Sequence, residues 1–190
     1  MRCRNDEIAR RNGAAMIRRV LSIIMAQLGW FAVAMLAARG QGTAAALAGV
    51  PVLFINAILS GHFTSTLRFG VLAALLGPIA DLALVHAGML TLNTPLLAGV
   101  WMPPWWSVLW GMFATAVPFG FSFLKGRPVL AATLGAIAAP FSYFAGAGLG
   151  AISLGRSPIL SLILVALIWA IAMPLLVRWG AHTTEEVPRG

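Results

Sequence analysis

Long apolar runs, each ended by charged residues, glycine or proline, dominate the chain. The runs cover residues 20–38, 43–60, 69–87, 105–124, 129–152 and 158–179. A helix of about 20 apolar residues, rising about 1.5 Å per residue, crosses the hydrocarbon core of a bilayer. The pattern therefore predicts an all-α, polytopic integral membrane protein, a compact bundle of six transmembrane helices.

Lysine and arginine are distributed unevenly over the connections between these runs. With the N-terminus inside, the outer side holds only Arg39 and Arg156. The cytoplasmic side then holds Arg2, Arg4, Arg10, Arg11, Arg18, Arg19, Arg68, Lys125, Arg127, Arg178 and Arg189. Because cytoplasmic loops of membrane proteins are rich in Lys and Arg, we predict an N-in/C-in protein of the bacterial inner membrane.

The predicted organisation has three parts. Residues 1–19 form a basic cytoplasmic arm, residues 20–179 form the membrane domain, and residues 180–190 form a cytoplasmic tail. Most connections between the runs are short, which favours antiparallel neighbouring helices in a single bundle.

Composition agrees with lipid as the surrounding solvent. The chain is 60% hydrophobic and 9% charged, against about 45–50% and about 25% in soluble domains. The net charge of +8 does not indicate nucleic acid, because the basic residues lie in short segments instead of on one face. We expect the bilayer as the main partner, no nucleic acid, and either a membrane protein partner or a homo-oligomer as open alternatives.

Asp81 is the only acid within any predicted span. An acid near the bilayer centre costs roughly 2.5–3.5 kcal/mol on insertion scales, and intramembrane acids mark functional sites by default. No Lys or Arg lies at its depth in the sequence. Asp81 must therefore be protonated, share hydrogen bonds, face water in a cavity, or meet a cationic or donor-rich ligand. Pro78, three residues earlier, predicts a kink beside it.

Depth along the spans suggests which side chains accompany Asp81. Thr115, Ser142 and Tyr143 fall at a similar level on other spans, and we expect them as its partners. Together with Trp30, Asp81 and Tyr143 are predicted to line a small cavity enclosed by the first, third and fifth spans. A second polar layer, Gln27 and Asn56, lies toward the cytoplasm, where hydrogen bonding between helices is the plainer interpretation.

Small residues recur at helical spacing on two spans. Gly77 belongs to such a ridge on the third span, and Gly135, Gly146 and Gly150 belong to one on the fifth. Small residues let helix backbones approach closely in lipid, so both ridges predict helix packing.

The longest outer connection carries a cluster of tryptophans. Trp101, Trp105 and Trp106 lie around Pro103 and Pro104. Tryptophans near a span boundary are typical headgroup anchors, and we favour this interpretation over a role in stacking on a ligand.

The sequence lacks the residues that several kinds of site require. The three histidines are dispersed and Cys3 stands alone, so no metal site is predicted. The chain has no nucleophile elbow and no phosphate-binding loop with a lysine. We expect no cofactor, and most enzyme classes are disfavoured.

Several short motifs resemble a known family. They are Gln27–Phe31, Gly77–Asp81, Pro103–Trp106 with Leu109-Trp110, Gly126–Pro128 and Ala139–Gly146. In this order they resemble the small bacterial inner-membrane proteins catalogued as domain of unknown function 2878. The resemblance implies a membrane fold in which Gln27, Trp30, Asp81 and Tyr143 coincide with the family's pattern, and it implies no activity.

Three functions stay open. The first is a module that binds or transports a small molecule or lipid in an intramembrane cavity around Asp81. The second is a structural or accessory subunit in which Asp81 is a polar clamp between helices. The third is a lipid-acting membrane enzyme that uses Asp81 and Tyr143. A pocket reaching Asp81 favours the first or third, and a dry, fully hydrogen-bonded Asp81 favours the second.

Overall fold

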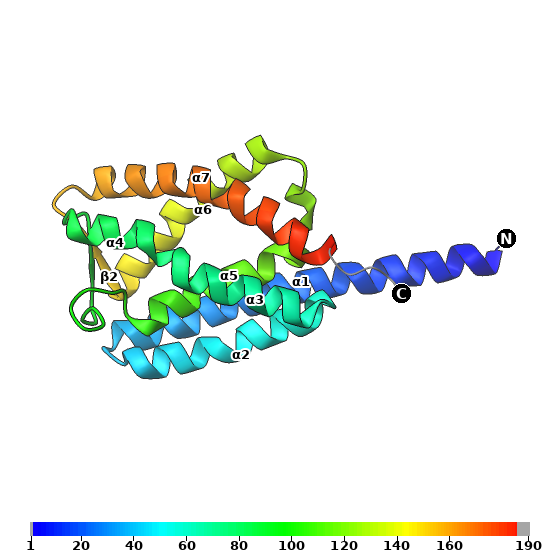
Figure 1. The fold of residues 1–190 in the computed structure, drawn as a ribbon, viewed down its shortest axis with the longest axis horizontal. Helices are drawn as coiled ribbons and strands as arrows, with labels where there is room; N and C mark the ends of the chain where they lie inside the picture. Colours follow the sequence, from blue (N-terminus) through cyan, green and yellow to red (C-terminus); the bar gives the residue numbers. More distant parts are fainter. Residues whose placement is uncertain (1, 186–190) are drawn as a thin grey trace.

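The long elements of the protein are all helices, as the computed structural model shows for residues 2–185 (Figure 1). Side chains are described for residue 13 and residues 15–182. The helices are α1 (Arg2–Ala38), α2 (Gly42–Ser60), α3 (Phe63–Leu76), α4 (Pro78–His86), α5 (Pro104–Gly120), α6 (Pro128–Leu149) and α7 (Pro158–Glu185). A short 3-10 helix, η1 (Ser122–Leu124), follows α5.

The helices are long and apolar enough for a multi-pass membrane protein. Within residues 2–185, the segments that could cross a bilayer are Ala15–Ala38, Gly42–Ser60, Phe63–His86, Pro128–Leu149 and Pro158–His182. The predicted fourth span, 105–124, is too long. Its helix, α5, ends at Gly120 after 17 residues, and the chain then tightens into η1.

Helix α5 lies at the centre of the bundle. It packs against α1, α2 and α3, whereas α6 and α7 pack mainly against each other. Ten of the 17 residues of α5 are buried, a larger share than in the five longer spans. The outer helices instead present large apolar side chains at the surface, including Phe141 and Ile159, as a lipid-facing surface requires.

Both ends of the described chain lie at the same end of the bundle. Figure 1 shows α1 projecting from the end of the bundle at which the α2–α3 connection and the end of α7 lie, opposite β2. Helix α1 continues from the predicted basic arm into the first span without interruption. The chain therefore returns to the side on which it begins.

The third apolar run is divided just before its acid. Helix α3 ends at Leu76 and α4 begins at Pro78, while Gly77 between them keeps helical angles and donates to the Ala73 carbonyl at 2.8 Å. Pro78 occupies the first turn of α4, where its missing N–H costs least. Asp81 consequently lies in the first turn of a new short helix.

A small sheet, which the sequence pattern did not predict, closes one end of the bundle. Strands β1 (Leu90–Leu92) and β2 (Ile152–Leu154) pair antiparallel, with Thr91 opposite Ser153. The predicted fifth span, 129–152, is correspondingly too long. Gly150 adopts a left-handed conformation, with φ of 85°, and ends α6 at Leu149, which is the usual role of glycine at a helix C-terminus.

Candidate functional site

Asp81 is completely enclosed by hydrogen-bond donors. The side chain has 0% exposure. The indole N–H groups of Trp106 and Trp110 donate to Oδ2 at 2.8 Å and 2.7 Å. The hydroxyl of Tyr143 donates to Oδ1 at 2.5 Å. The carboxylate thus joins α4 to α5 and α6 with neutral partners.

Local sequence places these donors on one side. Trp106 and Trp110 are four residues apart on α5, so their side chains lie on the same face of the helix. Gly77 makes room for one of them, because a Cβ there would overlap the indole ring of Trp110. The glycine that divides the third span therefore lets an indole approach the acid four residues later.

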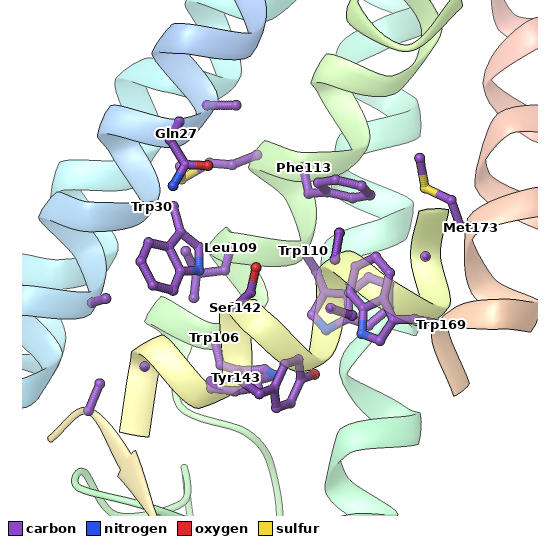
Figure 2. Close-up of a pocket in the computed structure, with 18 of the residues that line it drawn as sticks. Gln27, Trp30, Trp106, Leu109, Trp110, Phe113, Ser142, Tyr143, Trp169 and Met173 are labelled. Atoms are coloured by element: carbon purple, nitrogen blue, oxygen red, sulfur yellow. The ribbon is translucent and has the colours of Figure 1, made fainter. Parts of the chain in front are cut away.

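The same three donors form part of the wall of a cavity of about 260 Å³ (Figure 2). The cavity lies between α1, α5, α6 and α7, with β2 at one end. Asp81 is not among the lining residues, so it lies behind the wall. The volume is slightly below the roughly 300–1,000 Å³ typical of small-molecule pockets.

The lining is mainly apolar and strongly aromatic. The aromatic lining residues are Trp30, Trp105, Trp106, Trp110, Phe113, Phe121, Tyr143 and Trp169. Among the lining residues that the structure describes, none is charged. Trp169 stacks on Trp110 with ring centroids 4.7 Å apart and meets Phe113 edge to face at 5.1 Å. Such interlocked rings give the wall a fixed shape.

The opening of the cavity lies between α1 and α6. Gln27 on α1 and Ala138 and Ser142 on α6 line the cavity, and all three residues are exposed. Figure 2 shows Gln27 and Trp30 facing Ser142 across the space. These residues lie in the middle of Ala15–Ala38 and Pro128–Leu149, two segments long and apolar enough to cross a bilayer.

The structure separates the residues that the sequence grouped around Asp81. Tyr143 contacts it directly, whereas Trp30 and Ser142 face the cavity on the other side of the wall. Thr115 is not among the lining residues and faces Gly70 of α3, while its hydroxyl donates to the Met112 carbonyl of its own helix at 2.9 Å. Of the three spans predicted to enclose the cavity, the first and fifth, α1 and α6, line it and the third does not. The fourth and sixth spans, α5 and α7, also contribute lining residues.

Sequence reasoning missed the indole donors. The interpretation as headgroup anchors is wrong for Trp105 and Trp106, which are 1% and 6% exposed. Trp105 donates to the Thr94 hydroxyl at 2.6 Å. A signal for the site was present in the spacing of Trp106 and Trp110, which puts two N–H donors on one helical face.

The two residues of the predicted second polar layer, Gln27 and Asn56, do not lie together. Asn56 is buried and accepts a hydrogen bond from the Ser22 hydroxyl at 2.8 Å, which links α1 to α2. Gln27 instead lines the cavity. Gln27 on α1 therefore faces the cavity, whereas Asn56 on α2 faces Ser22 of α1.

The predicted packing glycines have different surroundings. A Cβ at Gly135 would overlap the carbonyl of Trp169, so this glycine allows α6 and α7 to approach closely. Gly146 faces the side chain of Ile152 in β2. Gly150 is outside α6, and a Cβ there would meet open space, so its assignment to helix packing is wrong.

Among the residues that the structure describes, no three His, Cys, Asp or Glu side chains gather as a metal site would require. No curated protein and no solved structure matches the chain. A family model described as "Protein of unknown function (DUF2878)" matches residues 19–175, which is most of the 190-residue chain. The match includes every residue that forms the wall around Asp81. The chain belongs to the DUF2878 family.

Proposed function

We propose that this protein is a binding module of the bacterial inner membrane that takes an apolar or amphiphilic small molecule from the bilayer into the cavity between α1 and α6. The observation that carries the proposal is the cavity itself: about 260 Å³, walled by interlocked aromatic rings, and open beside the middle of two apolar segments that could cross a bilayer. A ligand that partitions into lipid reaches such an opening without crossing a polar surface.

The proposal includes six spans with both termini in the cytoplasm. Helix α5 is the additional span, since 17 residues at about 1.5 Å each give about 26 Å, at the short end of the range for a transmembrane helix. The common location of the start of α1 and the end of α7 supports an even number of crossings. Lys125 and Arg127 are in the connection at that end, and Arg39 and Arg156 are in connections at the other.

Polar groups at the opening favour an amphiphilic ligand. Gln27 and Ser142 supply an amide and a hydroxyl beside an otherwise apolar space. A few placed polar groups within apolar walls orient a ligand in typical small-molecule sites. The apolar part of the ligand then packs on the rings of Trp30 and Trp169.

A structural or accessory subunit is the second candidate. The observation that favours it is the enclosure of Asp81, which has 0% exposure and three hydrogen bonds. In that function the acid clamps α4, α5 and α6, and a membrane protein partner or a second copy of the chain covers the opening.

Blocking the opening of the cavity distinguishes the two candidate functions. We would purify the protein in nanodiscs and identify co-purifying molecules by native mass spectrometry for wild type, Ala138→Trp and Ile137→Trp. Ala138 lines the cavity, whereas neighbouring Ile137 is 55% exposed and outside the lining, so it is a control at the same depth. A binding module loses its specific molecule only in Ala138→Trp. Identical bound molecules in all three proteins contradict the proposal.

A further inference from the structure

The hydrogen bonds around Asp81 match a carboxylate. An indole N–H can donate a hydrogen bond but cannot accept one. Oδ2 accepts hydrogen bonds from the indoles of Trp106 and Trp110, so neither bond uses a proton on this oxygen. Tyr143 donates to the other oxygen. An ionised carboxylate has only acceptor sites and can satisfy all three donors simultaneously.

Among the residues that the structure describes, the hydrogen-bond partners of this carboxylate include no positively charged group. Buried charges in proteins are normally paired, because an unpaired charge in an apolar medium is costly. The groups that hydrogen-bond to Asp81 are two indoles and a phenol, all neutral. The described residues that line the adjacent cavity are uncharged too. The cavity is therefore the available space near Asp81 in which a positive charge could lie.

The wall between them suits a cation. The faces of Trp and Tyr rings attract ammonium groups, and quaternary ammonium ligands are recognised in aromatic cages. Hydrogen bonds polarise the groups that share them, so donation to an anion makes an aromatic ring more electron-rich. Trp106, Trp110 and Tyr143 each donate to Asp81 and each line the cavity. They relay the negative potential of the carboxylate to the cavity.

We propose that the ligand of the cavity is an amphiphilic organic cation, whose substituted ammonium group lies against Trp106, Trp110 and Tyr143 while its apolar part packs on the ring of Trp30. This inference rests on the proposed function, because it names the chemical class of the ligand. The apolar lining of the cavity fits the apolar part of this ligand, and the carboxylate behind the wall favours its positive charge.

The test compares two probes of the same shape. Benzyltrimethylammonium carries a positive charge, and neopentylbenzene has carbon in place of the nitrogen. Binding of each would be measured by native mass spectrometry on the full chain in nanodiscs, for wild type and Asp81→Asn. Asparagine can accept both indole N–H groups through its oxygen and donate to the Tyr143 hydroxyl through its nitrogen, so it removes the charge and keeps the hydrogen bonds.

We expect wild type to bind the cation at least about tenfold more tightly than the neutral probe, a ratio within the range of cation–π attraction in a desolvated site. In Asp81→Asn the cation should lose this advantage while neopentylbenzene binds as before. Equal binding of both probes by wild type overturns the cation inference and leaves apolar binding in place. If Asp81→Asn does not fold, the comparison of the two probes on wild type still decides the inference.

Binding of neither probe to wild type also overturns the inference. The proposed function is then judged separately, by the co-purifying molecules of Ala138→Trp and Ile137→Trp. An unchanged cation preference in folded Asp81→Asn overturns the role of the carboxylate.

Discussion

Tyr143 on α6 donates its hydroxyl to Asp81 on α4 at 2.5 Å, across 62 residues of chain. This bond and those of Trp106 and Trp110 meet at one carboxylate. Because all three rings also line the cavity, the acid holds the wall of a cavity that it does not itself line. The stability of the bundle and the shape of the site are therefore coupled through Asp81.

Replacing Asp81 by leucine should lower stability far more than replacing it by asparagine. Leucine leaves two indole N–H groups and a phenol without their acceptor, and each buried unsatisfied group costs about 1–3 kcal/mol. Asparagine retains an acceptor for the indoles and a donor for the phenol oxygen. Thermal unfolding in detergent, followed by tryptophan fluorescence, measures both variants. Equal losses in the two variants would show that the charge, and not the hydrogen bonding, stabilises the bundle.

Tyr143→Phe should destabilise the protein by about 1.5–3 kcal/mol, the usual contribution of a hydrogen bond to a charged group. The ring keeps its edge-to-face contact with Trp106, at a centroid distance of 5.7 Å, so the variant removes only the hydroxyl. Phe144→Leu is the control, because Phe144 is the next residue and is 63% exposed. Its unfolding midpoint should match wild type. A wild-type midpoint for Tyr143→Phe would mean that the other donors compensate for the lost bond.

The importance of Asp81 could be predicted because the free-energy cost of placing a carboxyl group in lipid is independent of the fold. Asp81 is conspicuous in an apolar run, and Tyr143 is at the depth that the predicted spans assign to it. The indole donors were hidden by their position after Pro103 and Pro104, where a span boundary suggests headgroup contact. The connection before α5 also contributes Thr94, whose hydroxyl accepts a hydrogen bond from the neighbouring Trp105.

The strands were unpredictable for a related reason. Leu90–Leu92 and Ile152–Leu154 are three residues long, too short for a periodic pattern, and each is ordered by a partner far along the chain. The position of Gly150 beyond the end of α6 was equally difficult to predict, since a glycine in an apolar run also fits a packing ridge. Long-range pairing, not local propensity, decided these boundaries.

Gly135→Val should disrupt the contact between α6 and α7. A side chain at Gly135 would overlap the carbonyl of Trp169 and meet Met173, so the helices must separate. Gly148→Val is a matched control on the same helix, because a Cβ at Gly148 would meet nothing within 4 Å. Overpacking typically costs about 1–3 kcal/mol, and thermal unfolding should show this loss for Gly135→Val alone. Equal midpoints for both variants would contradict the close packing of these helices.

Cysteine labelling on both sides of α5 tests whether this short helix crosses the membrane. In a Cys3→Ser background, Val100→Cys lies in the connection before α5, where Val100 is 67% exposed, and Arg127→Cys lies in the exposed connection after it. With six spans and cytoplasmic termini, a membrane-impermeant maleimide should label Val100→Cys in intact cells and Arg127→Cys only after the membrane is opened. Labelling of both in intact cells means that α5 does not cross. The reverse pattern means that α5 crosses but the orientation is opposite, so that the basic connections would face outward against the distribution of lysine and arginine in other membrane proteins.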